Sequence, residues 1–294
     1  MGSHLKRLFE DNEYKISYPD SDTLNLKNKK KINLFIKKNY ITHIINCAGK
    51  VGGILDNYLN QIDYFRENIE INYNLISSSY EEGIKNFLNL SSSCMYPSNF
   101  MSKMNEKKLM LGDLEVTNFG YALAKLTSAN YVKLIRDKFK YNYSNVIPCN
   151  LYGPNDNFNE NTSHLIGSII KKISYAKKNN IREIEVWGDG TPKREFLYID
   201  DLVNFLFSCI NKDYQLPSFV NIGFGIDYSV KDYYKKVMKI YDHKVKLVYN
   251  RDKPNGVKRK LLDISLAKKE FKFKPKTNLE KGLKNTIKYY ENSL

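Results

Sequence analysis

Short apolar segments alternate with longer amphipathic ones through the first half of the chain. A short apolar run that ends in small or polar residues predicts a buried β-strand. Apolar residues that recur at steps of three and four predict an amphipathic helix. Strands that alternate with helices are typical of a parallel, doubly wound α/β sheet, the fold class that we predict. The predicted strands are 14–18, 43–47, 87–90 and 144–148, a turn is expected at 20–23, and the predicted helices are 32–39, 58–82 as one helix or a broken pair, and 121–139.

The pattern changes after about residue 151, where loops and turns separate further amphipathic helices. Asp200 is expected to cap the helix that it begins, because a side-chain oxygen there can accept a bond from a free backbone N–H group. We predict a first lobe at 1–155, a smaller second lobe at 156–294, and a piece near 194–211 that returns to the first lobe. The elements expected in this half are a loop at 153–157, a turn-rich segment at 186–196, and helices at 163–179, 200–211, 229–241 and 279–291.

The chain has 294 residues, of which 42% are hydrophobic, so it can bury the core of one large or two moderate domains. No apolar run approaches the roughly 20 residues of a membrane span, and no secretory signal is visible at the start, so we expect no membrane contact. The four cysteines lie far apart, without the C-x-x-C spacing that is typical of zinc sites. We therefore expect a cytoplasmic protein with free thiols and no bound metal.

The formal net charge of +15 invites comparison with nucleic-acid-binding proteins. The lysines are spread along the chain, however, and the basic run at 27–32 begins an ordinary helix pattern, so its charges fit a solvated helix face. We therefore expect no nucleic-acid partner. The positive field would suit an anionic ligand that carries a diphosphate.

Tyr121 and Lys125 stand four residues apart, which places their side chains one turn apart on the same helix face. An ammonium group beside a phenol stabilises the phenolate and lowers the phenol pKa from about 10 toward neutrality. Such a phenol can give its proton to a carbonyl oxygen while hydride reaches the carbonyl carbon. A chance pair on a helix surface has the same spacing, so the interpretation depends on the motifs around it.

Three further residues fit proton-transfer chemistry. Ser92 and Cys94 follow a predicted strand two residues apart, so on an extended chain they point to one side. The serine hydroxyl can bond a carbonyl oxygen, and the thiol can act as a base if nearby cations lower its pKa of about 8.5. The same residues also fit a strand-end turn and a packed thiol. His164, near a predicted helix start, fits either a capping or exposed histidine, or an acid opposite a cysteine base.

Several motifs, in order and over nearly the whole chain, resemble the extended short-chain dehydrogenase/reductase family, or NAD-dependent epimerase/dehydratase family. Within it, they are most similar to the 3,5-epimerase/4-reductases of GDP-4-keto-6-deoxy-mannose. The resemblance implies a Rossmann-like first domain at 1–155 that binds NADP as NADPH, with NAD as the open alternative. It also implies a nucleotide-sugar lobe at 156–294 and a homodimer. The motifs are 48–54, 92–97, 121–125, 150–158, 163–164, 187–196 and 258–263.

The resemblance also implies roles for individual residues. Tyr121 would be the acid at reduction, and Lys125 would lower its pKa and bind the nicotinamide ribose. Ser92 would bond the sugar carbonyl, while Cys94 and His164 would be base and acid for epimerisation. The implied cofactor-binding residues are Gly2, Asp22, Leu90, Ser91, Ser92, Lys125, Pro148, Asn150, Leu151 and His164, and the implied substrate-binding residues are Lys172, Trp187, Arg194 and Lys246.

The chemistry of a 4-keto sugar is consistent with these roles. A C4 ketone acidifies the protons on C3 and C5, because the enolate places its charge on the C4 oxygen, where Ser92 and Tyr121 could stabilise it. Cys94 together with His164 favours retained epimerisation. The alternatives are a related enzyme with one activity, for instance on a GDP-heptose, and a non-catalytic relative that binds nucleotide sugars.

The start of the chain departs from the family pattern. The family opens with a strand and a glycine-rich turn that holds the cofactor pyrophosphate, and here Gly2 aligns with the last glycine of that turn. The explanations are a start assigned too late or a lost N-terminus, a cloning remnant at 2–4, or a protein without the cofactor cradle. We favour an incomplete sequence, because a missing central strand would expose the edges of its neighbours.

Overall fold

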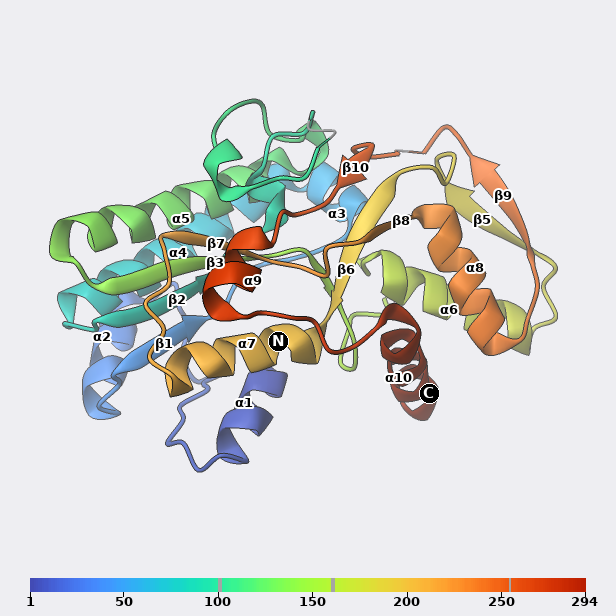
Figure 1. The fold of residues 1–294 in the computed structure, drawn as a ribbon. Helices are drawn as coiled ribbons and strands as arrows, with labels where there is room; N and C mark the ends of the chain where they lie inside the picture. The colour runs from blue at the N-terminus through green and yellow to red at the C-terminus, as the bar shows by residue number, and fades with distance from the viewer. Residues whose placement is uncertain (100–101, 160–161, 254) are drawn as a thin grey trace.

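The computed structural model describes residues 1–99, 102–159, 162–253 and 255–294. Its main sheet has the strand order β1-β2-β3-β7, and every neighbouring pair is parallel. Helices cover both faces of this sheet (Figure 1), so the predicted doubly wound α/β fold is confirmed. The strands are β1 (His43–Asn46), β2 (Asn86–Leu90), β3 (Asn142–Pro148) and β7 (Phe219–Ile222).

Two apolar cores hold the helices on the main sheet. Consecutive residues of a strand point to opposite faces, so Phe87 enters one core and Leu88 the other. On the Phe87 face lie α2 (Lys29–Lys38), α4 (Gln61–Glu81) and α5 (Phe119–Phe139), which bury Ile32, Ile76 and Val132. On the Leu88 face lie α1 (Gly2–Glu10), α7 (Ile199–Asn211) and α9 (Ser265–Phe271), which bury Leu5, Leu202 and Ala267.

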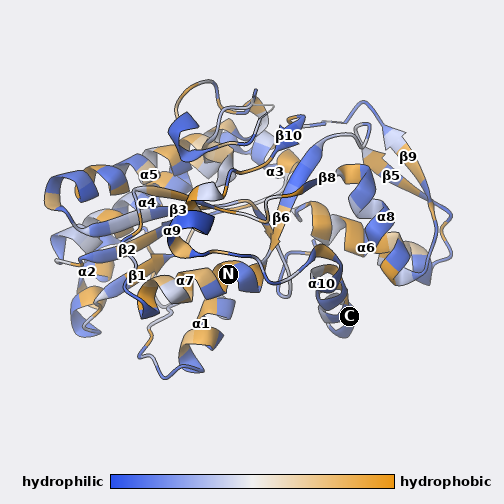
Figure 2. Cartoon of the chain, in the orientation of Figure 1, coloured by the Kyte–Doolittle hydropathy of each residue, from blue (hydrophilic) through white to orange (hydrophobic). Residues whose placement is uncertain are grey.

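The remaining strands form two small sheets beyond one end of the main sheet (Figure 1). A third core, with Ile166, Ile170, Tyr233 and Leu283, joins them to three helices. Figure 2 shows both apolar and polar residues on α6 and α8, as expected of helices that face a core on one side and water on the other. The elements are β4 (Asn150–Tyr152), β6 (Lys193–Tyr198), β8 (Asp227–Ser229) and β10 (Arg259–Lys260) in one sheet, β5 (Glu183–Trp187) and β9 (Lys246–Asn250) in the other, and α6 (Leu165–Lys178), α8 (Val230–Tyr241) and α10 (Leu279–Asn292).

Most predicted elements of the first half are confirmed to within a few residues. The stretch 58–82 is the broken pair, with α3 (Ile54–Leu59) and α4 separated at Asn60. The strand predicted at 14–18 is wrong: the segment is irregular, because no strand among the described residues lies beside it to bond its backbone. Short 3₁₀ turns lie in the connections at Ser93–Met95, Glu106–Lys108 and Val116–Asn118.

Two predictions for the second half are corrected. The cap of α7 is Tyr198 rather than Asp200, which lies in the first turn and bonds Nδ1 of the buried His4 at 2.7 Å. The segment 186–196 is less turn-rich than predicted, because it holds the end of β5 and most of β6 on either side of a turn at Gly188. The short strands of this half and the short α9 lack the periodicity that would predict them. No helix in the described part of the chain has the length and apolar character to cross a bilayer.

Candidate active site

The candidate site lies at the carboxyl ends of the main-sheet strands, where doubly wound folds bind ligands. β2 runs directly into Ser91 and Ser92, and β1 runs into Cys47 and the loop that contains Gly49. The first turns of α5 pass beside these ends and carry Tyr121 and Lys125. The topology therefore gathers residues that are far apart in the sequence at one edge of the sheet.

Lys125 is buried, and its Nζ donates a hydrogen bond to the carbonyl oxygen of Leu90 at 3.0 Å. Burial lowers the pKa of Lys125 to about 8. A side chain at Gly49 would collide here, since an added Cβ would lie 2.8 Å from Oδ1 of Asn68 and 3.4 Å from Nζ of Lys125. Burial raises the pKa of the neighbouring Cys47 to about 11, although the charge of Lys125 acts against this shift.

The expected effect of Lys125 on Tyr121 is corrected by the structure. Burial raises the pKa of the Tyr121 phenol, the charge of Cys94 adds to the rise, and a hydrogen bond with Ser92 opposes it. Lys125 does not offset this rise. Its ammonium group is bonded to the Leu90 carbonyl oxygen, and burial lowers the pKa of that ammonium group. Tyr121 therefore holds its proton at neutral pH, in the form that a proton donor needs.

Cys94 lies in a polar cluster that the sequence analysis did not identify. Nδ2 of Asn118 donates to its Sγ at 3.1 Å, and Nζ of Lys260 donates at 3.7 Å. Lys260 also forms an ion pair with the buried Glu115 at 2.9 Å, and Thr117 donates to the other oxygen of that carboxylate at 2.8 Å. The motif at 258–263 was the available signal for Lys260, but the resemblance had attached no role to it.

Arg194 joins the same cluster from β6. It pairs with Lys260 in the register of β6 and β10, and its guanidinium donates to the carbonyl oxygen of Val257 at 2.7 Å. Burial lowers the pKa of Arg194, while the charges of Glu115 and Cys94 oppose the shift. Arg194, predicted to bind substrate, therefore lies close to Cys94, predicted to act on it.

His164 lies at the N-terminus of α6 with an exposed side chain, and its backbone carbonyl accepts a bond from Ser168 N at 2.9 Å. Its electrostatic partner is Asp156, whose pKa is raised by burial against the opposing charge of His164. The chain just before His164 reaches the β1 loop, because Gly53 N donates to the Thr162 carbonyl at 3.1 Å. His164 thus belongs to the rim of the site.

The other predicted substrate residues divide into two groups. Lys172 and Trp187 meet at Glu185: the lysine donates to its carbonyl oxygen and the indole to its carboxylate, each at 3.0 Å. Lys246 instead pairs with Glu183 on the exposed surface at 2.7 Å. Because Glu183 and Trp187 are four residues apart on one strand, about 13 Å separates them. The structure brings Lys172 and Trp187 together and leaves Lys246 at the other end of β5.

The predicted cofactor residues lie mostly at the strand ends. Ser91 is buried and donates to Oδ1 of Asn145 at 3.3 Å, while Asp22 lies in an exposed turn. Gly2 begins α1, at a helix N-terminus that has no side-chain cap. Leu90 and Pro148 are the last residues of β2 and β3, and Asn150 and Leu151 begin β4.

These residues fit a dinucleotide at its nicotinamide end only. Lys125 is fixed beside Gly49, where the closeness of Lys125 and Asn68 leaves no room for a side chain. On the pyrophosphate side, the described residues offer the N-terminus of α1 without a side-chain cap, and Gly2, around which an added Cβ would meet no atom within 4 Å. A tight glycine-rich turn is therefore not found in the described part of the chain.

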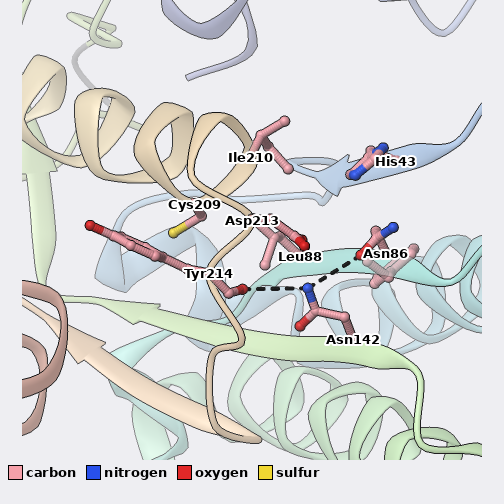
Figure 3. Close-up of a pocket in the computed structure, with 9 residues that line it drawn as sticks. His43, Asn86, Leu88, Asn142, Cys209, Ile210, Asp213 and Tyr214 are labelled. Atoms are coloured by element: carbon pink, nitrogen blue, oxygen red, sulfur yellow. Dashed lines mark hydrogen bonds between the residues drawn. The ribbon is translucent and has the colours of Figure 1, made fainter.

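A second, shallow pocket lies at the amino ends of β1, β2 and β3, below the end of α7 (Figure 3). In it, Nδ2 of Asn142 donates to Oδ1 of Asn86 at 3.2 Å and to the Tyr214 carbonyl at 3.4 Å. Tyr121 and Lys125 lie at the opposite ends of the strands. This pocket is therefore separate from the candidate site.

Comparison with known proteins identifies the family. A model of the NAD dependent epimerase/dehydratase family matches residues 1–223. The chain belongs to the NAD dependent epimerase/dehydratase family. It is 41% identical over 293 residues to a GDP-L-colitose synthase of Yersinia pseudotuberculosis, covering 99% of this chain and 95% of the relative. It is 34% identical over 277 residues to a GDP-L-fucose synthase of Azorhizobium caulinodans, covering 94% and 88%.

These relatives make this member of the epimerase/dehydratase family an enzyme of the GDP-L-fucose synthase type. A solved GDP-mannoheptose C4 reductase from Campylobacter jejuni, with NADP bound, has the same fold, with a TM-score of 0.87 and 24% identity. The alignment covers 99% of this chain and 95% of that one.

Proposed function

We propose that the protein epimerises and then reduces a GDP-4-keto-6-deoxy-sugar with NADPH. The observation that carries the proposal is one site that holds a thiol among hydrogen-bond donors beside the Tyr121 phenol and the buried Lys125. The GDP-L-fucose and GDP-L-colitose synthases that resemble the chain support the substrate class. When bound, NADPH supplies the hydride that reaches C4.

Epimerisation begins with Cys94 as the base. Its thiolate takes a proton from C3 or C5, and the electron pair of that C–H bond moves toward the C4 oxygen. Ser92 and Tyr121 donate hydrogen bonds to this oxygen and stabilise the enolate. His164, on the rim of the site, returns a proton from the other face of the ring.

Reduction uses Tyr121 and Lys125. A phenol with an ordinary pKa of about 10 is protonated at neutral pH, and burial raises the pKa of Tyr121 further, so Tyr121 can give its proton to the C4 oxygen. Lys125 lies one turn further along the same helix face and would bind the nicotinamide ribose. Residues 1–155, with the returning piece near 194–211, form the cofactor-binding domain in this proposal, and residues 156–294 form the nucleotide-sugar domain.

The nucleotide is held by the second lobe together with Arg194, which stands at the start of the piece near 194–211. Arg194 is the best-placed partner for the diphosphate, since its guanidinium lies beside the cysteine that acts on the attached sugar. Lys172 and Trp187, which meet at Glu185, would hold the rest of the nucleotide, with the indole covering the base or the sugar.

Incubation of the protein with GDP-4-keto-6-deoxy-mannose in D₂O tests the proposal, with and without NADPH. We expect deuterium at C3 and C5 without NADPH and a reduced, epimerised product with it. Cys94→Ser should lose the deuterium exchange and keep reduction of an already epimerised ketone. Exchange by Cys94→Ser at the wild-type rate would assign the base to another residue.

The same assay separates the alternatives. The 41% identity to a GDP-L-colitose synthase favours a comparison with the 3-deoxy form of the substrate, which can be epimerised only at C5. Reduction without exchange would indicate a single-activity reductase. Absence of NADPH binding in a calorimetric titration, both in this chain and in a version extended by a strand and a glycine-rich turn, would favour a non-catalytic relative instead.

We also propose that the protein is a homodimer. The outer face of α4 exposes Ile62, Phe65 and Tyr73, and their spacing of three and eight residues places them on one side of the helix. Apolar stripes of this kind commonly mark protein interfaces. A second copy of the same helix pair, α4 with α5, would cover this stripe on both chains.

A further inference from the structure

The cluster around Cys94 is assembled from three distant parts of the chain. Cys94 follows β2, Glu115 precedes the turn that leads into α5, and Lys260 comes from β10 near the end of the chain. Lys260 contacts both other residues, with its Nζ 3.7 Å from the sulfur and 2.9 Å from the carboxylate. Only 15% of its side chain is exposed, so water screens these contacts poorly.

The charges of the cluster balance when the thiol is ionised. Lys260 and Arg194 are the cations that face Cys94, Glu115 is the anion, and the phenol of Tyr121 is neutral at physiological pH. Burial acts to lower the pKa of Lys260, but the charges of Cys94 and Glu115 raise it above its ordinary value, so the ammonium stays protonated. Burial acts to raise the pKa of Glu115, but Lys260 holds it below its usual value. With two cations and one carboxylate, a neutral thiol leaves an excess positive charge and a thiolate cancels it.

We propose that Lys260 is the positioning residue that holds Cys94 as a thiolate, and that Glu115 fixes the lysine in place for this purpose. The role rests on the proposed function, in which Cys94 is the base. Lys260 takes no proton from the sugar: the C–H proton passes to the sulfur, the electron pair passes to the C4 oxygen, and the ammonium keeps its protons throughout. Asn118 donates a second hydrogen bond to the sulfur and completes the support of the thiolate.

Alkylation of Cys94 by iodoacetamide tests the proposal directly, because the thiolate is the reactive form. The rate is followed from pH 5 to pH 10 by mass spectrometry of the peptide that contains Cys94, with no cofactor or sugar present. Loss of an adjacent opposite charge typically moves such a titration by about 1–3 pH units. In Lys260→Met we therefore expect the alkylation midpoint to rise by about that amount, and the rate at neutral pH to fall about tenfold or more.

Two variants serve as controls. Lys258→Met removes a charge from the exposed lysine two residues earlier and should leave the midpoint unchanged. Lys260→Arg keeps the positive charge, so its alkylation midpoint should stay close to that of the wild type. If Lys260→Met fails to fold, Lys260→Met/Glu115→Gln removes both members of the ion pair and should still show a raised midpoint, because Lys260 contacts the sulfur directly, but a smaller rise than Lys260→Met, because the opposing carboxylate is also lost.

An unchanged midpoint in Lys260→Met, or in the folded double variant, would overturn the proposal. The experiment is independent of the sugar chemistry. A shifted midpoint in a protein that exchanges no sugar protons would support the role of Lys260 toward the thiol and would contradict the proposed epimerisation alone. In an active enzyme, the pH profile of C3 and C5 exchange should move with the alkylation midpoint, while hydride transfer to an epimerised ketone stays unchanged.

Discussion

At the residue scale, burial changes the chemistry of the tyrosine and lysine more than their spacing does. The spacing predicts that Lys125 lowers the pKa of Tyr121, but the lysine is bonded to the Leu90 carbonyl and burial raises the pKa of the phenol. A sequence gives the separation of two residues along a helix, and it does not give the depth at which that helix lies. The identity of the pair could be predicted from the sequence, and its electrostatics could not.

The depressed pKa of Lys125 makes a prediction about stability. Its pKa is about 8 in the folded chain and about 10.4 in the unfolded chain. Between these values the unfolded state binds the extra proton, so this group makes stability rise with pH across that window and costs the full amount below pH 8. The cost is roughly 3 kcal/mol. Lys125→Met should therefore be more stable than wild type at pH 7, with the difference shrinking toward pH 10.5.

Urea unfolding at pH 7, 8, 9 and 10 measures this difference, because other titrating groups cancel between the two proteins. A difference that is constant over the whole range would show that Lys125 has an ordinary pKa. Lys133→Met, on the same helix at a side chain that is 42% exposed, provides a control that should show no such trend.

At the element scale, the strands of the main sheet carry an unexpected polar ladder. Asn46, Asn89 and Asn145 occupy paired positions on β1, β2 and β3, and each amide donates to the next at 2.9 Å. Nδ2 of Asn46 also donates to Oδ1 of Asn72 on α4 at 2.7 Å. The strands themselves could be predicted from their apolar runs. Their register could not, because it depends on which asparagines face one another across strands that are 43 and 56 residues apart.

Asn89→Leu should destabilise the fold, because two buried side-chain groups lose their bond to Asn89. These groups are Oδ1 of Asn145 and one N–H of the Asn46 amide. Each buried group that loses its partner costs about 1–3 kcal/mol, so we expect a loss of at least roughly 2 kcal/mol in the free energy of unfolding. Chemical denaturation measures it. Asn86→Leu, at the half-buried start of the same strand, should cost less, and equal losses would contradict a special role for the ladder.

The exposed stripe on α4 predicts a change in assembly. Ile62 is 81% exposed in the single chain, so a charge there should not disturb folding, but it would be costly in a buried interface. We expect Ile62→Glu to shift the protein from dimer to monomer in light scattering coupled to size exclusion. Leu34→Glu, at a residue 67% exposed on α2, should leave the mass unchanged. A wild-type monomer would reject the dimer.

At the scale of the whole molecule, the site is completed by segments that lie far from Cys94 in the sequence. Cys94 comes from the first lobe, and Arg194 and Lys260 reach it on β6 and β10. The motifs that resemble the family predicted Arg194, since it stands within the motif at 187–196. The pairing of Arg194 with Lys260 required a structure, because β10 has two residues and no pattern that would predict a strand.

The arrangement of the lobes makes a paired prediction about substrate binding. Arg194 lies with Cys94 and Glu115, whereas Lys246 lies at the far end of β5 in an exposed ion pair with Glu183. A charge-assisted contact to a diphosphate is worth about 1.5–3 kcal/mol, which corresponds to a roughly 10- to 150-fold weaker affinity when it is lost. Arg194→Ala should therefore raise the KM for the nucleotide sugar by that factor and lower kcat for the reduction of an epimerised ketone much less, because the contact forms before the chemical step and reduction does not use Cys94. Lys246→Ala should leave both constants near their wild-type values.

Steady-state kinetics and calorimetric binding of GDP measure the two variants side by side. A raised KM in Lys246→Ala with an unchanged one in Arg194→Ala would move the diphosphate to the other end of β5 and away from Cys94.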